Sequence, residues 1–201
     1  MRIGLTALAL ILGVGCANAN TITYTEVTTA NGSLGSDPFS NTLVTLTGTG
    51  NTSDIMSIGG GDYVIPVSAT VKIASLDVTA TITSSIEVGV CTTCPDPDAD
   101  FDLGGATILG TDNSAFHSYF LATAIGPITS DGTSVGFGEP VNTSLGTFEF
   151  TTPGTPVFNA TLGGSSPVPE PNALMPAAAG LLALVLKRRG RKCSACSRML
   201  K

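Results

Sequence analysis

Four aspartates between positions 96 and 102 are the side chains whose types and spacing point most clearly to chemistry. The run reads Asp96-Pro97-Asp98-Ala99-Asp100-Phe101-Asp102. Alternate residues of an extended segment point to the same side, so these carboxylates would share one face and repel one another unless a cation or water screens them. Calcium takes about six to eight oxygen ligands. The run therefore predicts a calcium site at Asp96, Asp98, Asp100 and Asp102, with a solvated acidic loop as the alternative.

Two cysteines precede this run directly, in Cys91-Thr92-Thr93-Cys94. In an oxidising compartment this spacing favours a local disulfide between Cys91 and Cys94. A thioredoxin-like redox role needs a strand-to-helix context, which the neighbouring sequence does not indicate. Free or metal-bound thiols are the remaining alternatives. A second pair, Cys193 and Cys196, lies about a hundred residues further on, which is too far for the usual zinc-ribbon spacing.

The sequence predicts no catalytic residues, and we do not expect an enzyme. The string Gly132-Thr133-Ser134-Val135-Gly136 matches the nucleophile elbow of hydrolases, but that motif requires a parallel α/β fold with the histidine after the serine. The single histidine, His117, precedes Ser134 and is expected on an exposed strand position. A glycosidase or lyase that uses two carboxylates is a minor alternative, because acidic residues are abundant.

Apolar and Thr-rich segments of alternating pattern predict the elements that must position these residues. The expected strands cover 21–28, 42–47, 63–65, 70–83, 86–90, 106–109, 116–123, 145–150 and 157–162. Turns are expected at Asn31-Gly32 and Asp37-Pro38. The residues expected in the core from the long 70–83 stretch are Val71, Ile73, Leu76, Val78 and Ile82. Roughly nine to eleven short strands without an amphipathic helix indicate an all-β fold, a single β-sandwich of jelly-roll or immunoglobulin-like kind.

Charge is distributed very unevenly along the chain. Residues 20–163 contain fourteen acidic residues and one basic residue, Lys72, which gives this segment a formal charge of −13. A segment so acidic repels nucleic acids and anionic membrane surfaces and attracts divalent cations. We therefore expect no nucleic-acid partner.

The N-terminus has the three parts of a secretory signal peptide. Arg2 supplies the positive charge, residues 5–14 form the apolar segment, and Ala17-Asn18-Ala19 supplies small residues at the cleavage site. The pattern predicts a signal peptide at 1–19, cleaved after Ala19 by signal peptidase. Lipidation at Cys16 is an alternative that the residues before it fit poorly.

The C-terminus carries a second signal. A Gly- and Pro-containing linker at 164–171 leads to an uncharged run at 172–186, which as a helix is about 22 Å long. Local thinning of the bilayer and the long basic side chains beyond the run could make this a transmembrane helix. The basic cluster that follows places residues 187–201 in the cytoplasm.

The ordered combination of Val168-Pro169-Glu170-Pro171, a short apolar helix and a basic cluster resembles the PEP-CTERM protein-sorting domain. The resemblance covers about 25 residues and implies recognition at Pro169, Glu170 and Pro171 by an exosortase, a membrane protease. It implies passage from the inner membrane to the cell surface or the extracellular space, in bacteria that make exopolysaccharide and biofilm. The chain departs from the family in its further residues 193–201.

These observations lead to two expectations of different class. The first is an exported, non-catalytic envelope or extracellular-matrix protein associated with exopolysaccharide, without a cofactor. The second is a calcium-dependent, lectin-like module that binds glycan through the acidic run. The chain has no Trp, three Tyr and eight Phe, a composition that offers few aromatic surfaces for stacking on sugars.

Overall fold

The computed structural model of the chain describes residues 20–132 and 139–163. These residues form an antiparallel sheet of 12 strands together with three short 3-10 helices. The strands are β1 (Thr21–Leu34), β2 (Asp37–Asn51), β3 (Met56–Gly59), β4 (Asp62–Ile73), β5 (Val78–Thr81), β6 (Ile86–Cys91), β7 (Asp98–Leu103), β8 (Ala106–Asp112), β9 (Ile125–Thr129), β10 (Val141–Thr143), β11 (Gly146–Pro153) and β12 (Val157–Leu162). The 3-10 helices are η1 (Thr52–Asp54), η2 (Ala74–Leu76) and η3 (Ser114–Ser118).

Several predicted features fall outside the described residues. They are the signal peptide with Ala17 and Ala19, the motif Pro169, Glu170 and Pro171, the helix at 172–186, the basic tail, and Ser134. Within 20–132 and 139–163, no helix has the length and apolar character needed to cross a membrane.

Strand β1 follows from a regular alternation in its sequence. Ile22, Tyr24 and Glu26 are fully buried, whereas the threonines between them are partly exposed. This period of two puts one face of the strand in the core and the other near solvent. β1 pairs with β2 along nearly its whole length and with β12 and then β11 on its other side, so it is the central strand of the sheet.

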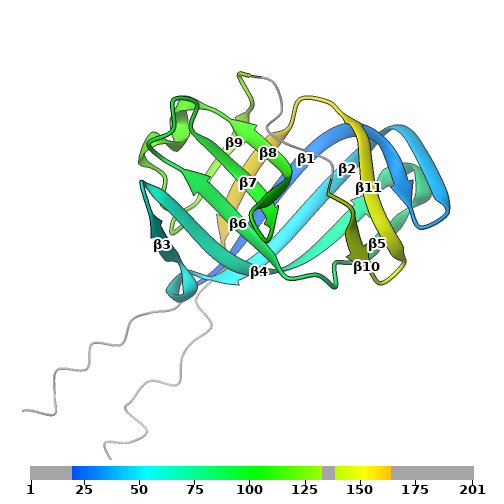
Figure 1. Cartoon of the computed structure of the whole chain (residues 1–201), viewed down its shortest axis with the longest axis horizontal. Helices are drawn as coiled ribbons and strands as arrows, with labels where there is room; N and C mark the ends of the chain where they lie inside the picture. Colours follow the sequence, from blue (N-terminus) through cyan, green and yellow to red (C-terminus); the bar gives the residue numbers. More distant parts are fainter. Residues whose placement is uncertain (1–19, 133–138, 164–201) are drawn as a thin grey trace, which may run out of the picture. The chain divides into compact units, whose positions relative to one another are not determined.

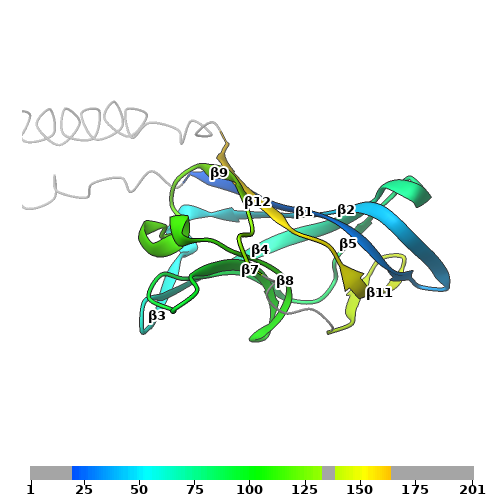
Figure 2. The same cartoon turned by 90° about the horizontal axis from the view of Figure 1, so that it is seen from above.

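Strand β4 joins the two halves of the sheet. Its C-terminal part, Ser68 to Ile73, pairs with β2, and its N-terminal part, Asp62 to Val67, pairs with β6. The order β1-β2-β4-β6-β7-β8 therefore runs continuously through β4. Figures 1 and 2 show the result: β6, β7 and β8 lie across from β1, β2 and β12, with the core between them.

The two ends of the sheet approach each other where β8 and β9 end. The backbone N–H of Asp131 donates to the carbonyl oxygen of Asp112 at 3.0 Å. The side-chain Nδ2 of Asn113 donates to the carbonyl oxygen of Thr129, also at 3.0 Å. The sheet thus closes nearly into a barrel, and we call this place, Asp112–Asn113 with Thr129–Asp131, the seam.

Aromatic side chains fill the core in two places. Phe116 and Phe158 pack edge to face at 5.4 Å, and Tyr24 lies beside them with its hydroxyl donating to the carbonyl oxygen of Leu121 at 2.6 Å. Near the turn of the β1–β2 hairpin, Phe148 of β11 stacks on Phe39 of β2. Buried aromatic residues of this size contribute a large share of the hydrophobic stabilisation of a small domain.

The all-β prediction is confirmed, and most expected strands lie within observed ones. The strand expected at 116–123 is wrong, because η3 and an irregular segment occupy this region. Phe116 and Tyr119 are both buried at a spacing of three, which matches a 3-10 turn rather than a strand. The Asn113 side chain starts this turn by accepting the N–H of Ala115 at 2.9 Å.

The turn expected at Asn31-Gly32 is also wrong, because both residues lie inside β1 at a shift in its register. A Cβ on Gly32 would lie 2.1 Å from the carbonyl oxygen of Glu149, so the glycine permits β11 to approach closely. Asn31 Oδ1 accepts the N–H of Asn41 at 2.7 Å, which fixes the neighbouring strand. The hairpin turn lies instead at Gly35-Ser36, four residues later.

Candidate functional site

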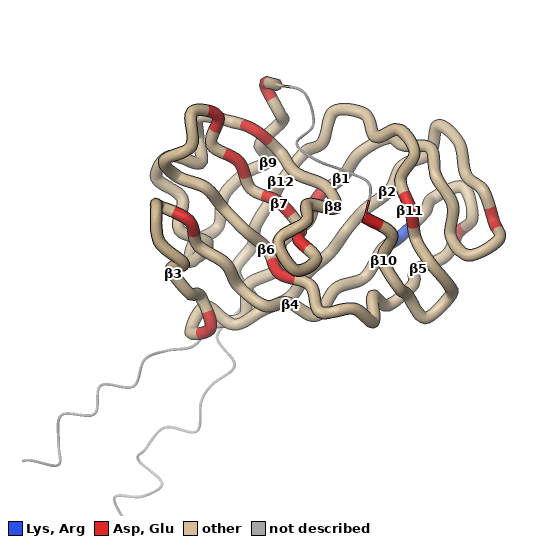
Figure 3. The backbone as a smooth tube through the Cα atoms, in the orientation of Figure 1, with Lys and Arg blue, Asp and Glu red and all other residues tan. Residues whose placement is uncertain are grey.

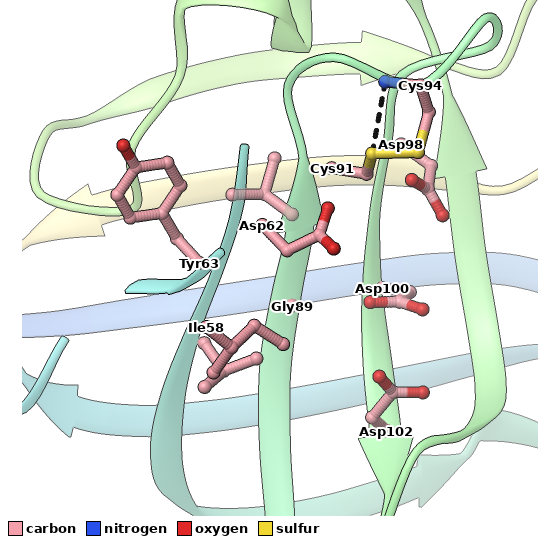
Figure 4. Close-up of a pocket in the computed structure, with 11 residues that line it drawn as sticks. Ile58, Asp62, Tyr63, Gly89, Cys91, Cys94, Asp98, Asp100 and Asp102 are labelled. Atoms are coloured by element: carbon pink, nitrogen blue, oxygen red, sulfur yellow. Dashed lines mark hydrogen bonds between the residues drawn. A yellow bond between two sulfur atoms is a disulfide. The ribbon is translucent and has the colours of Figure 1, made fainter. Parts of the chain in front are cut away.

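An acidic groove lies on the outer face of the sheet over β4, β6 and β7. Its volume is about 270 Å³. Aspartates from two strands line it together with a disulfide and a few apolar residues: Ile58, Asp62, Tyr63, Val64, Gly89, Val90, Cys91, Cys94, Asp98, Asp100 and Asp102. Figure 4 shows Asp98, Asp100 and Asp102 in a row along β7, with Asp62 directed toward them from β4. We refer to this site as the acidic groove.

Strand β7 positions the row through simple alternation. Ala99 and Phe101 are fully buried in the core, so the three aspartates between and beside them face the groove. The sequence therefore predicted correctly that carboxylates two residues apart share one face. Asp98, Asp100 and Asp102 lie in a paired strand, whereas Asp96 is exposed in the bend before it.

Gly89 on β6 makes room for the row. It is the direct partner of Asp100 in the register between β6 and β7. A Cβ at this position would lie 2.6 Å from Asp100 Oδ1 and 3.5 Å from Asp102 Oδ2. The two carboxylates therefore extend over the glycine, in space that any other residue would fill.

Asp100 is the most buried acid of the groove, with a relative exposure of 8%. Its Oδ2 accepts the hydroxyl of Thr107 at 2.8 Å, and burial together with the charge of Asp102 raises the pKa of Asp100 to about 8. Burial also raises the pKa of Asp102, whose Oδ1 is buried without a hydrogen-bond partner. The pair therefore holds a proton in the neutral pH range unless a cation replaces it.

Asp98, at the upper end of the row, is the register partner of Asp112 on β8. Burial, followed by the charges of Asp112 and Asp102, raises the pKa of Asp98 to about 6. Burial and the charges of Asp131 and Asp96 raise the pKa of Asp112. Negative charge thus accumulates from the groove to the seam, as the acidic residues in Figure 3 illustrate.

The disulfide closes the upper end of the groove. Cys91 and Cys94 are bonded to each other, and Cys91 Sγ accepts the N–H of Cys94 at 3.1 Å. Thr92, between them, donates its N–H and its hydroxyl to the carbonyl oxygen of Gly61 at 3.1 and 2.8 Å. The loop that carries the cysteines is therefore attached to the turn before Asp62.

The geometry of possible metal ligands differs from the sequence-based expectation. Asp96 is exposed and does not line the groove, whereas Asp62, which sequence reasoning missed, does. In the part of the chain that is described, one set of three metal-binding side chains has ligand atoms within 4.8 Å of one another, and it is Asp62, Cys91 and Cys94. The calcium site at Asp96, Asp98, Asp100 and Asp102 stays a prediction.

Asp62 gave no signal of its own in the sequence. It is 34 residues from Asp96 and follows a run of three glycines that reads as a turn. The pairing of Asp62 with Cys91 across β4 and β6 brings it to the groove. A long-range strand register of this kind cannot be deduced from local composition.

A further carboxyl group, that of Glu26, lies inside the barrel and not in the groove. It is fully buried, its Oε1 accepts the hydroxyl of Thr111 at 2.8 Å, and its Oε2 has no hydrogen-bond partner. Burial raises its pKa well above the ordinary range, and the nearby charges of Asp100, Asp98 and Asp112 act in the same direction. Alternation alone would have placed this residue in the core.

His117 lies in η3 and not on a strand. It is exposed, and its Nδ1 is 2.9 Å from the carbonyl oxygen of Thr92. This contact joins η3 to the disulfide loop. The imidazole of His117 therefore has a structural role.

Comparisons of the chain with protein-family models, with curated proteins and with solved structures found no match.

Proposed function

We propose that the chain is an exported, non-catalytic component of the cell envelope or extracellular matrix, associated with exopolysaccharide and biofilm. The observation that carries this proposal is the order of segments: a signal peptide, an acidic β domain, and a C-terminal segment that resembles an exosortase substrate. Signal peptidase and exosortase are its proposed processing partners. A β-sandwich of jelly-roll or immunoglobulin-like kind remains the proposed subclass of the domain.

Cell fractionation tests the proposed sorting. We expect the chain in the producing cell to lose its N-terminal signal and its C-terminal segment and to reach the cell surface or the medium. Replacement of Pro169, Glu170 and Pro171 by alanine should leave a longer form in the inner membrane. Recovery of the unaltered chain in the inner membrane, uncut at both ends, would contradict the proposal.

A second candidate function is calcium-dependent binding of glycan, and the acidic groove favours it. Asp100 and Asp102 extend side by side over Gly89, and Asp62 faces them from β4. Carboxylates in an open groove are suitable ligands for a hard cation that keeps free positions for sugar hydroxyl or carboxylate groups. Tyr63, the one aromatic residue of the groove lining, packs edge to face with Phe120 at 5.2 Å. The groove thus depends on charge more than on stacking.

Binding of the exported chain to the exopolysaccharide of its own cell, with calcium and with a chelator, tests this candidate. We expect binding with calcium and loss of binding with the chelator. Asp100→Asn with Asp102→Asn should abolish the calcium-dependent part. The matched control is Asp37→Asn, an exposed aspartate on the β1–β2 hairpin. Equal binding with and without calcium, or equal loss in both variants, would contradict a site in the groove.

A further inference from the structure

The upper end of the acidic groove brings together ligands of a kind that calcium does not use. The sulfur atoms of Cys91 and Cys94 and a carboxylate oxygen of Asp62 lie within 4.8 Å of one another. All three residues are partly exposed, so an ion from solvent can reach them. Thiolate sulfur and carboxylate oxygen are both ligands that zinc and similar divalent transition metals accept.

Strand register places a second carboxylate, that of Asp98, next to this set. Cys91 on β6 pairs with Asp62 on β4 and, on its other side, with Asp98 on β7. The two carboxylates therefore flank the cysteine from both neighbouring strands on the same face of the sheet. All four side chains line the same groove, and Figure 4 shows the disulfide, Asp62 and Asp98 at its upper end.

We propose that reduction of the Cys91–Cys94 disulfide opens a binding site for one zinc-class divalent cation, held by Cys91, Cys94 and Asp62, with Asp98 or water in the fourth position. Four ligands of this kind match the tetrahedral coordination that zinc prefers. In the disulfide form the sulfur atoms are bonded to each other and carry no charge, so the site is closed. The disulfide therefore acts as a redox gate on metal binding.

A thiol reductant supplies the electrons and protons that reduce the Cys91–Cys94 disulfide. Two reductant thiols are oxidised to a disulfide, and the Cys91–Cys94 bond accepts their two electrons and two protons to give two thiols. The cation then displaces these two protons and forms two metal–sulfur bonds. Reoxidation by a disulfide of the same class releases the cation and restores the bond between the sulfurs.

The loop has contacts that do not depend on the disulfide. Thr92 donates two hydrogen bonds to the carbonyl oxygen of Gly61, the residue before Asp62. His117 Nδ1 contacts the carbonyl oxygen of Thr92 from η3. These contacts hold the cysteines near Asp62 after reduction, so a preorganised site remains available for the cation.

The test measures zinc on the full chain in both redox states. Cys16, Cys193 and Cys196 are first replaced by serine, so that Cys91 and Cys94 are the remaining cysteines. After treatment with a phosphine reductant and equilibration with zinc, elemental analysis should find one zinc per chain, and after oxidation none. Cobalt in place of zinc should give the sulfur-to-metal charge-transfer absorption of thiolate ligands in the reduced sample only.

Variants separate this site from adventitious binding. Asp62→Asn should weaken zinc binding about tenfold or more. Asp37→Asn, at an exposed aspartate on the β1–β2 hairpin that does not line the groove, should leave zinc binding unchanged. Circular dichroism before and after reduction verifies that the domain stays folded. The proposal is wrong if the reduced chain takes up no zinc, if the oxidised chain takes up as much, or if Asp62→Asn binds like the parent chain. None of these results bears on calcium or on sorting, so the proposed function is tested separately.

Discussion

At the scale of single residues, Glu26 links the stability of the domain to pH. Its carboxyl is fully buried in the barrel with one oxygen unpartnered, and burial raises its pKa. The folded state therefore keeps a proton that the unfolded chain releases near its ordinary pKa of about 4.3. A raised pKa of this kind gives stability that is fully present at low pH and is lost as pH rises toward the folded value.

We predict that Glu26→Gln reduces the loss of unfolding free energy between pH 5 and neutral pH. Each proton that separates the two states corresponds to a slope of about 1.4 kcal/mol per pH unit, and the amide removes one such proton. Asp98 and Asp100, whose pKa values are raised to about 6 and 8, also release protons on unfolding. In Glu26→Gln the unfolding free energy should therefore still fall with pH, but less steeply. Urea unfolding across this range measures the slope. An unchanged slope, or an equal change in the exposed control Glu149→Gln, would contradict the role of Glu26.

A second residue-scale prediction concerns Gly89. Replacing glycine by alanine inside a strand is ordinarily favourable, because glycine loses more backbone entropy on folding. Here the new methyl group would lie 2.6 Å from Asp100 Oδ1, so we expect Gly89→Ala to lower the unfolding free energy by about 1–3 kcal/mol. The same substitution in an Asp100→Ala background should cost clearly less, because the opposing carboxylate is gone. Additive effects in this double-mutant cycle would show that the carboxylate does not cause the loss.

At the scale of elements, the seam depends on a small number of polar contacts. Asn113 both starts η3, by accepting the N–H of Ala115, and bridges the seam, by donating to the carbonyl oxygen of Thr129. Asn51 starts η1 in the same way, by accepting the N–H of Ser53 at 3.0 Å. It also accepts the Ser53 hydroxyl at 2.9 Å, but none of its observed contacts crosses the seam. The two asparagines therefore form a matched pair.

We predict that Asn113→Ala lowers the unfolding free energy by about 1 kcal/mol more than Asn51→Ala does. Both variants lose a cap, but the further bond lost by Asn113→Ala bridges the seam, whereas that lost by Asn51→Ala is a local, exposed contact with the Ser53 hydroxyl. Hydrogen exchange should locate the difference: amides at the ends of β8 and β9 should exchange faster in Asn113→Ala than in the control. Equal unfolding free energies with unchanged exchange at these strands would mean that the seam bond contributes nothing.

The comparison of sequence and structure shows which elements local patterns can predict. β1, β2, β6 and β12 alternate regularly or carry β-branched runs, so the strands expected at 21–28, 42–47, 86–90 and 157–162 lie within them. The strand predicted at 116–123 was wrong because the buried aromatic residues of this region, Phe116 and Tyr119, are three positions apart. That spacing is typical of a 3-10 turn and not of a strand. The row on β7 was recognised from its spacing, but Asp62 was not, because a register across β4 and β6 brings it there.

At the scale of the whole molecule, the excess of negative charge lowers the stability of the folded domain. Residues 20–163 carry a formal charge of −13, and fourteen acidic side chains are confined to one small domain. Self-repulsion among so many like charges opposes the compact state. Salt weakens this repulsion, because the Debye length falls from about 30 Å at 0.01 M to about 8 Å at 0.15 M.

We predict that the melting temperature of residues 20–163, expressed alone, rises by several degrees when NaCl increases over this range. A change of 1 kcal/mol in the unfolding free energy shifts the melting temperature by about 2–4 °C in domains of about 150 residues or more, close to the length of this segment. Scanning calorimetry at fixed pH measures the shift, and an uncharged osmolyte at equal osmolarity provides the control. A melting temperature that stays constant or falls with NaCl would contradict the role of self-repulsion.

The single basic residue of this segment, Lys72, has a consequence for the resistance of the domain to proteolysis. Proteases that cut after lysine or arginine find one such peptide bond between residues 20 and 163. That bond lies in β4, where Lys72 pairs with Thr45 of β2 on one side and with Thr79 of β5 on the other. A protease needs an extended, unpaired segment, so cleavage there requires local unfolding of an internal strand. We therefore expect the folded domain to resist digestion by trypsin-like proteases.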